Sequence, residues 1–374
     1  MTETSPTVVV GAGAAGLATA AVLAAAGQPV ELLERADRVG AAWAGRYDSL
    51  HLHTPRSLSA LPGLPIPRSF GRWVARDDLV RYLDAYARHA GLRPELGVTV
   101  TRVDRAADGW TVHTDAGDRP ASRVVLATGY SHTPRPLAWP GVETFTGDLR
   151  HSADYRDPSA YAGQQVLVVG AGNSATEIAL DLLSVGSQVS LSVRTPPNIV
   201  RREAFGVPSQ VFGIALKHAP APVMDPLSAL MRRVSVPDLT DVGLPATRDP
   251  YSQFRRTGTV PILDTGIVAA LRAGRVRVVA ATESFDGARV CLADGSSLEP
   301  DAVIAATGYT TGLEPVVGHL GVLDARGVPL VHGAAELPTA PGLHFVGIKA
   351  ELSGLLREIG RDARAVGRAL ARPT

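Results

Sequence analysis

The hydrophobic pattern opens with a short apolar run, a glycine-rich turn and a longer charge-free stretch. Residues 7–10 are almost wholly apolar, residues 14–26 are rich in alanine and leucine, and residues 29–33 are again mostly apolar. Short apolar runs bounded by glycine are typical of buried strands, whereas a longer apolar stretch is typical of a packed helix. We therefore predict a strand over 7–10, a helix over 14–26 and a strand over 29–33, the start of a doubly wound α/β fold.

This pattern begins a second time near the middle of the chain. Residues 166–169 are apolar, a glycine turn follows at 170–172, and a further apolar run ends near residue 193. Two other predicted strands end in the same Ala-Thr-Gly sequence, at residues 124–130 and 303–309. Because glycine after a strand permits a sharp bend, we expect the chain to cross between domains at these two places. The sequence predicts two Rossmann-like dinucleotide-binding domains, with residues 158–300 inserted into a domain formed by 1–157 and 301–374.

The segments between these patterns are less regular. Residues 35–75 contain four prolines between 55 and 67 and read as a long loop, a type of segment that commonly walls a ligand. Apolar spacing predicts a helix over 77–89, and alternating patterns predict strands over 98–104, 110–114 and 123–127. Residues 222–236 have helical spacing, and residues 237–262 carry no clear pattern.

One alternative for the opening segment is a membrane span, since residues 8–26 carry no charge and are long enough to cross a bilayer. A secretory signal would begin with positive charge, yet residues 1–7 offer only Glu3. The glycine spacing favours a buried strand and a packed helix, and we expect a cytoplasmic protein without a membrane segment.

Composition narrows the function classes. The 374 residues are 45% hydrophobic and 20% charged with a net charge of +1, which gives no general attraction to nucleic acid. The single cysteine, Cys291, excludes an intramolecular disulfide and a C-x-x-C redox pair. Its surroundings predict a short strand in a hairpin, where it is a bystander.

The first glycine pattern, which we call the first fingerprint, occupies residues 8–16. Gly11 allows the tight turn, Gly13 lets a pyrophosphate approach the backbone, and Gly16 permits close helix packing. The following strand leads to Glu34, an acid that can accept hydrogen bonds from ribose hydroxyls. These features predict a site for FAD.

The second fingerprint occupies residues 166–175, with Gly170, Gly172 and Ala175 at its three key positions. Its second strand leads to Arg194, in the slot where the first fingerprint has Glu34. A base there can pair with a 2′-phosphate that a carboxylate would repel, so we predict NADPH rather than NADH.

Residues 145–156 match the pattern F-x-G-x-x-x-H-x-x-x-Y-R. This is the identifying sequence of flavin-containing monooxygenases, and the chain resembles that family from Val8 nearly to its C-terminus, most closely its YUCCA-like branch. Baeyer–Villiger enzymes of the same superfamily carry tryptophan where this chain has Tyr155, so ketone-to-ester chemistry is the less favoured branch.

The resemblance implies roles for individual residues. His53, followed by Thr-Pro as in the YUCCA-like branch, stands where animal-type relatives have asparagine, and its imidazole could donate to the flavin or to a peroxide oxygen, although a loop histidine bonded to backbone is the alternative. His53 and Asn173 are the candidate catalytic residues. His151 and Tyr155 are expected at the join of the domains, where they either handle NADPH or serve only as a linker. The other expected cofactor contacts are Ala14, Ala15, Arg35, Trp43, Val103, Ala127, Thr128, Gly129, Ser174, Thr307, Gly308, Gly347 and Leu355.

The activity that the resemblance implies is an NADPH-dependent flavin monooxygenase. NADPH reduces FAD, O2 adds to form a C4a-(hydro)peroxyflavin, and a small molecule is oxygenated, either at nitrogen or sulfur or by decarboxylation of a 2-oxo acid such as indole-3-pyruvate. No metal site is predicted. Two alternatives stay open: an NADPH oxidase or reductase without oxygen transfer, and a non-catalytic flavin redox sensor. Arg357 and Glu358 would crowd or charge a pocket that relatives keep small, so the sequence does not identify the substrate. It does not identify the oligomeric state either.

Overall fold

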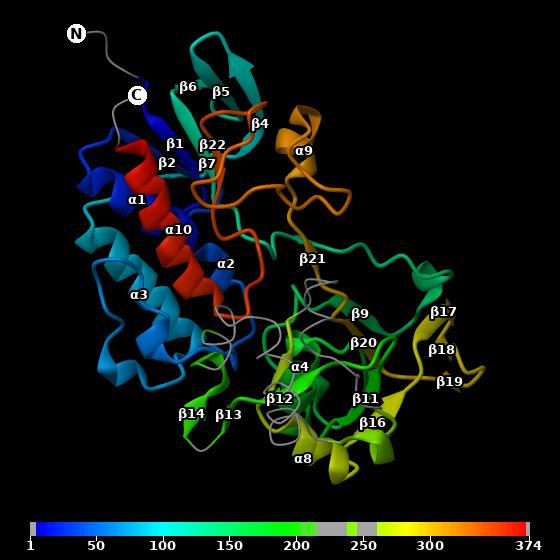
Figure 1. Cartoon of the computed structure of the whole chain (residues 1–374). Coiled ribbons are helices and arrows are strands. Elements are labelled where there is room, and N and C mark those ends of the chain that lie inside the picture. Colours follow the sequence, from blue (N-terminus) through cyan, green and yellow to red (C-terminus); the bar gives the residue numbers. More distant parts are fainter. Residues whose placement is uncertain (1–4, 205, 212–213, 215–237, 245–259, 372–374) are drawn as a thin grey trace, which may run out of the picture. The chain divides into compact units, whose positions relative to one another are not determined.

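The computed structural model describes residues 5–204, 206–211, 214, 238–244 and 260–371. The chain forms two compact units (Figure 1). The first unit comprises residues 1–45, 54–133 and 309–374, and the second comprises residues 46–53 and 134–308. The boundaries differ from those expected at three places, because residues 46–53, 134–157 and 301–308 all join the second unit. The physical reason for the last two is that each contributes a strand to the second unit's sheet.

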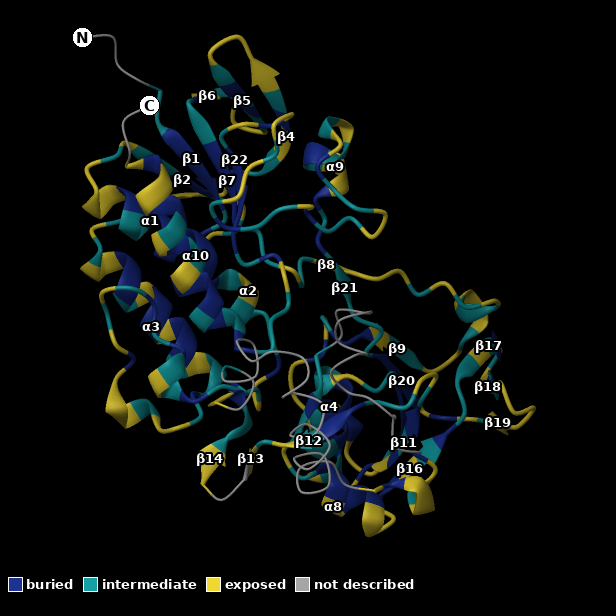
Figure 2. Cartoon of the chain, in the orientation of Figure 1, coloured by how far each residue is buried: buried dark blue, intermediate teal, exposed yellow. Residues whose placement is uncertain are grey.

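The first unit is built on a parallel five-stranded sheet in the order β22-β7-β1-β2-β3. Its central strand β1 (Thr7–Val10) pairs in parallel with β2 (Val30–Glu34) on one side and β7 (Arg123–Leu126) on the other. The edges are β3 (Glu95–Leu96) and β22 (Leu343–Phe345). Parallel sheets are covered on both faces, and β1 is accordingly buried along its whole length (Figure 2).

Helices cover one face of this sheet and a small antiparallel sheet covers the other. The helices are α1 (Ala14–Ala25), α3 (Arg76–His89) and α10 (Leu355–Leu370), of which α1 contacts both others (Figure 1). Gly367 of α10 lies so close to α1 that a Cβ there would meet Val22 Cγ1 at 2.3 Å. The antiparallel strands β4 (Val100–Ala106), β5 (Gly109–Thr114) and β6 (Arg119–Ala121) bury Trp110 and Val112 against residues of β1 and β7.

The second unit repeats this plan. Its parallel sheet has the order β16-β11-β10-β20-β9, formed by β9 (Asp148–His151), β10 (Gln165–Val169), β11 (Gln188–Ser192), β16 (Val276–Val279) and β20 (Ala302–Ala305). Helices α4 (Asn173–Leu183) and α8 (Ile267–Arg272) pack on one face. The antiparallel strands β17 (Thr282–Asp286), β18 (Arg289–Leu292) and β19 (Ser297–Leu298) pack on the other.

Side-chain alternation along β10 explains how one strand serves both layers. Val166 and Val168 belong to the core beneath the helices, whereas Leu167 and Val169 belong to the core beneath β17 and β18. Because side chains in a strand point alternately to opposite faces, a strand buried on both faces must be apolar at every position. This is why the strands of both fingerprints read as continuous apolar runs.

Most predicted elements agree with the structure. The predicted helices 14–26 and 77–89 correspond to α1 and α3, and the predicted strands 98–104, 110–114 and 123–127 correspond to β4, β5 and β7, with ends that shift by one or two residues. Cys291 lies half-buried in the hairpin of β17 and β18, as expected. The predicted helix 222–236 lies outside the described residues, as does most of 237–262.

The proline-rich loop is held against α3. Tyr82 Oη donates to the carbonyl of Leu64 at 2.7 Å and accepts from the Leu61 amide at 2.8 Å, and Tyr86 Oη donates to the carbonyl of Pro62 at 2.6 Å. Burial raises the pKa of each tyrosine to about 12. Both hydroxyls therefore stay protonated donors at neutral pH, which fixes the loop on the helix.

The remaining short elements connect these layers. They are α2 (Ala41–Ala44), η1 (Arg56–Leu58), η2 (Arg68–Phe70), β8 (Thr133–Pro134), η3 (Val142–Thr144), η4 (Ser159–Tyr161), β12 (Ile199–Arg201), β13 (Glu203–Ala204), β14 (Val207–Pro208), η5 (Thr240–Val242), β15 (Ile262–Asp264), β21 (Tyr309–Thr310), α9 (Glu314–Val317) and η6 (Gly318–Leu320). The charge-free run 8–26 is divided between β1 and α1. In the part of the chain that the structure describes, no helix combines the length and the apolar character that crossing a membrane requires.

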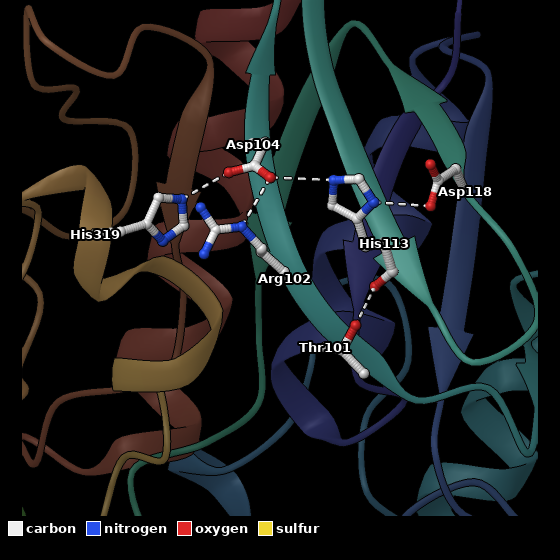
Figure 3. A network of polar contacts seen from close by, with 6 residues as sticks. All are labelled: Thr101, Arg102, Asp104, His113, Asp118 and His319. Carbon is white, nitrogen blue, oxygen red and sulfur yellow. Dashed lines mark hydrogen bonds and ion pairs between the residues drawn. The ribbon is translucent and has the colours of Figure 1, made fainter.

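A polar network links β4 and β5 to η6 within the first unit (Figure 3). Asp104 accepts from Arg102 Nε at 2.8 Å, and contacts His113 Nε2 at 3.1 Å and His319 Nε2 at 2.8 Å. The Arg102 guanidinium, and next His319, lower the pKa of Asp104 against the opposing effect of burial. This aspartate therefore stabilises the folded state in its ionised form.

We predict that Asp104→Asn lowers the free energy of unfolding at pH 7 by about 1 kcal/mol or less, as is usual for exposed ion pairs. The pKa of Asp104 is lower in the folded state than the unfolded value of about 3.9, so its stabilisation is present above that pH and is lost as the pH falls below it. Thermal unfolding at pH 7 and pH 3 measures this, and a difference between the proteins that is larger at pH 3 would contradict the prediction.

Candidate active site

The first fingerprint forms a turn whose glycines differ in what surrounds them. Gly11 has a φ of +102°, and a Cβ there would meet the carbonyl oxygen of Ala127 at 3.0 Å. A Cβ on Gly16 would lie 1.7 Å from the Gly11 oxygen, whereas a Cβ on Gly13 would meet nothing within 4 Å. Gly11 and Gly16 are thus required by the fold itself. The described residues give no steric reason for glycine at position 13, and an approaching pyrophosphate would fit the open space there.

The start of α1 supplies the groups that would hold this anion. Gly13 caps the helix without a side-chain hydrogen bond, and Ala14 and Ala15 of the first turn are buried. The amides of a helix's first turn have no partner within the helix and bind anions readily. A residue from the far end of the chain adjoins this turn, since a Cβ on Gly347 would lie 2.7 Å from Ala15 Cβ.

Glu34 lies at the end of β2 beside the fingerprint. Its Oε2 accepts from the Ala12 amide at 2.6 Å and its Oε1 accepts from the Ala36 amide at 3.0 Å. The carboxylate is therefore held at the glycine turn, where it can also accept from ribose hydroxyls. Arg35, the next residue, is exposed.

Thr128 gives a further sign of a ligand at this edge of the sheet. It lies two residues after the end of β7 and beside Gly11, where a Cβ would be 3.5 Å from Thr128 Cα. Its hydroxyl oxygen is buried and has no hydrogen-bond partner within the described residues. Buried polar atoms are nearly always bonded, so this oxygen has an unmet bonding requirement that a cofactor could meet. Gly129, which follows, has a φ of +81°.

Three other expected contacts in the first unit lie in different surroundings. Trp43 lies half-buried in α2, and Leu355 is the first residue of α10. The Val103 side chain is fully buried in the core of the first unit, so only its backbone could contact a cofactor.

The second fingerprint has the same turn. Gly170 has a φ of +126°, and a Cβ there would meet the Ala306 oxygen at 2.5 Å, while a Cβ on Gly172 would meet nothing within 4 Å. Ala175 is fully buried in α4. Thr307, the counterpart of Thr128, also has a buried hydroxyl oxygen without a partner in the described part of the chain. This loop therefore fits a second dinucleotide by the same criteria.

Strand register corrects the position that the sequence gives to Arg194. In the first unit Val10 pairs with Leu33 and the Gly11 amide donates to the Leu33 oxygen. In the second, Val169 pairs with Ser192 and the Gly170 amide donates to the Ser192 oxygen. The residue that follows Ser192 is Val193, which therefore corresponds to Glu34, and Arg194 corresponds to Arg35.

His151 has both ring nitrogens engaged by backbone. The Ala153 amide donates to Nδ1 at 3.0 Å, so Nε2 carries the proton and donates to the Gly308 oxygen at 3.1 Å. Burial lowers the pKa of His151, which favours this neutral form. The ring thus ties the end of β9 to the Thr307–Gly308 turn, and these contacts favour the structural alternative that the sequence left open.

Tyr155 is also held inside the second unit. Its ring is buried and its hydroxyl donates to Asp181 Oδ2 at 2.8 Å. Burial is the main cause that raises the pKa of both groups. Asn173, at the start of α4, accepts from the Leu263 amide at 3.1 Å, so it joins the nucleotide loop to β15.

The structure brings His53 to a residue that the sequence did not single out, Glu177. His53 Nε2 contacts Glu177 Oε1, and Tyr47 Oη donates to Glu177 Oε2 at 2.7 Å. Glu177 lies on α4 one turn after Asn173. An acid on the same side of the helix as Asn173 was the one feature of the sequence that could have marked Glu177 as a site residue. The contact itself joins residues more than a hundred positions apart and left no local trace.

Arg357 and Glu358 do not add net charge to their surroundings. Glu358 is buried at the start of α10, accepts from Ser353 Oγ at 2.8 Å and pairs with Arg357. Arg361 Nη1 also lies 3.5 Å from Glu358 Oε1, so two arginines share this carboxylate.

Comparisons with known proteins show the family of this chain. Residues 8–204 match the family described as pyridine nucleotide-disulphide oxidoreductase. The chain is 35% identical over 349 residues to indole-3-pyruvate monooxygenase YUCCA1 of Oryza sativa subsp. japonica, covering 91% of this chain and 86% of that one. It is 32% identical over 355 residues to probable indole-3-pyruvate monooxygenase YUCCA4 of Arabidopsis thaliana, covering 93% and 86%. A solved flavin-containing monooxygenase from Stenotrophomonas maltophilia is 26% identical with a TM-score of 0.75, covering 98% of this chain and 97% of that one.

The chain belongs to the flavin-containing monooxygenases, in their YUCCA-like branch. This flavin monooxygenase has the predicted α/β fold with two Rossmann-type domains and uses FAD and NADPH. The single cysteine means that dithiol chemistry does not accompany its match to the disulphide oxidoreductase family.

Two glycine variants separate folding from cofactor binding. We predict that Gly16→Ala destabilises the protein by about 1–3 kcal/mol, because its Cβ would overlap the Gly11 oxygen. Gly13→Ala should leave the melting temperature of the FAD-free protein unchanged but lower its FAD content, because the Cβ enters open space at the pyrophosphate site. Visible flavin absorbance and thermal unfolding measure the two effects. Full FAD occupancy in Gly13→Ala would be the contradicting result.

Proposed function

We propose that this flavin monooxygenase acts on a small organic 2-oxo acid of the indole-3-pyruvate class, with O2 as co-substrate. The observation that carries the proposal is the 35% identity to an indole-3-pyruvate monooxygenase across 91% of the chain. The overall reaction balances as R–CO–COOH + O2 + NADPH + H⁺ → R–COOH + CO2 + NADP⁺ + H2O.

We also propose which unit holds which cofactor. In the first unit the α1 amides would bind the pyrophosphate of FAD and Glu34 would accept from its ribose. In the second unit the α4 amides would bind NADPH, and Arg194 would pair with the 2′-phosphate. Bound at these sites, NADPH would supply a hydride and FAD would supply the O2-activating chemistry. The protein's own contribution is to bind and orient these groups, so no catalytic triad is needed.

The strand register in the second unit makes the proposal for NADPH depend on Val193 as well as Arg194. Val193 replaces the acid that the first fingerprint has, which removes a repulsion of the 2′-phosphate, and the exposed Arg194 adjoins it. A long guanidinium side chain one position further along remains able to reach the phosphate and to bind it with two donors.

Coupling tests the reaction. With indole-3-pyruvate present, we expect about one molecule of the shortened acid R–COOH and one of CO2 for each NADPH consumed, with little hydrogen peroxide. Amines and thioethers serve as comparison substrates, and better coupling with them would shift the substrate class to nitrogen or sulfur nucleophiles. Hydrogen peroxide as the sole product with every substrate would overturn oxygen transfer in favour of an NADPH oxidase.

For cofactor choice, we predict that Arg194→Glu raises the KM for NADPH by roughly 10-fold to 100-fold, since a bond to a charged group contributes about 1.5–3 kcal/mol. The KM for NADH should change little, because NADH lacks the 2′-phosphate. Arg201→Glu, an exposed arginine of β12 in the same unit, is the control. Equal changes for both nucleotides would remove Arg194 from the phosphate site.

A further inference from the structure

Residues 46–53 are fixed to the second unit, although the chain on either side of them belongs to the first. The Asp48 amide donates to the Arg156 oxygen at 2.8 Å, and Arg202 Nη2 donates to the Leu52 oxygen at 2.8 Å. The Tyr47 ring lies 6.2 Å from the Tyr155 ring. His53 ends this segment, so the second unit determines its position.

Glu177 lies at the centre of these contacts, with each carboxylate oxygen engaged by a different side chain. Tyr47 Oη donates to Oε2 and His53 Nε2 contacts Oε1. Burial, and next the charge of Glu177, raise the pKa of Tyr47 well above its usual value, so this hydroxyl is a donor. The Glu177 side chain is 12% exposed and that of His53 is 27% exposed. Glu177 is therefore a mostly buried acceptor for two donors.

We propose that Glu177 is a positioning residue that holds His53 in its Nε2–H form and thereby presents Nδ1 as a proton acceptor. A carboxylate accepts hydrogen bonds only, so the nitrogen that faces it must carry the proton. In a neutral imidazole the other nitrogen is then the acceptor. Among the described residues, Nδ1 of His53 has no hydrogen-bond partner, and the ring is partly exposed.

This arrangement reverses the role that the sequence gives to His53. A neutral ring held in this way accepts from an O–H or N–H group of a bound substrate or cofactor, rather than donating to it. If a proton moves, it passes from that group to Nδ1 and leaves the group as its conjugate base, while Nε2–H stays on Glu177. The carboxylate stabilises the imidazolium that results, as in other carboxylate–histidine pairs. The identity of the partner rests on the proposed function, whereas the tautomer does not.

Nuclear magnetic resonance of 15N-histidine-labelled protein tests the tautomer without any assay of activity, because the 15N shift of Nδ1 shows whether that nitrogen is unprotonated, as proposed, or carries a proton. We expect a ring Nε2–H signal of His53, assigned by its loss in His53→Gln, that is protected from exchange by Glu177. It should disappear in Glu177→Ala and persist in Glu177→Gln, whose amide oxygen can still accept. Asp181→Asn is the matched control, because Asp181 is the other acid of α4 and bonds Tyr155 and Ser49 rather than His53. A signal that persists in a folded Glu177→Ala protein would overturn the proposal.

Kinetics then test whether Glu177 acts through His53. Glu177→Ala should lower kcat about tenfold or more, with the KM for NADPH within twofold, and Glu177→Gln should recover part of the loss. Adding Glu177→Ala to His53→Ala should cause no further loss, whereas independent losses that add would refute action through His53. If the protein transfers no oxygen at all, the proposed function fails while the resonance result still decides the tautomer.

Discussion

Both nucleotide sites depend on one steric constraint, the approach of the carbonyl that comes just after a neighbouring strand to the first glycine of the fingerprint. The Ala127 oxygen would lie 3.0 Å from a Cβ on Gly11, and the Ala306 oxygen 2.5 Å from one on Gly170. These separations exclude a Cβ at Gly170 and crowd one at Gly11, and the positive φ of each glycine turns the chain directly from strand to helix. The helix then begins over the carboxyl ends of the parallel strands, with its free amides available to a pyrophosphate. The repeated Ala-Thr-Gly sequence is the other half of this contact, which explains why it occurs once per unit.

Local patterns were sufficient to predict most of this scaffold. The apolar runs and glycines predicted β1, α1, β2 and α3 to within a residue or two, because a strand buried on both faces has few alternatives to an apolar sequence. They did not reveal which unit a segment joins. Residues 134–157 contribute β9 to the second sheet through pairing with β20, a contact between segments about 150 residues apart. Pairing of this kind has no local signal, and for the same reason His53 could be selected from its motif whereas its partner Glu177 could not.

The two sites differ most at the residue that follows the last paired position of the second strand. In the first unit this is Glu34, whose carboxylate is held by the Ala12 and Ala36 amides, and in the second it is Val193. Both are followed by arginine, Arg35 or Arg194. An arginine is therefore available at each site, and the sites differ in whether a glutamate precedes it. A carboxylate fixed at the turn disfavours a second negative group there, so under the proposed assignment of NADPH the loss of the acid would favour the 2′-phosphate in addition to the arginine.

Helix α4, which follows the second glycine loop, also anchors residues 46–53 and Tyr155. Its only charged residues are Glu177 and Asp181, four positions apart and so on the same side of α4. Each acid accepts from a buried tyrosine, Tyr47 and Tyr155 respectively, and those two rings contact each other. Removing a partner would leave a mostly buried carboxylate unpaired, which is costly, so these contacts are retained together. Any displacement of α4 that accompanies nucleotide binding must therefore move residues 46–53, including Tyr47 and His53, with it.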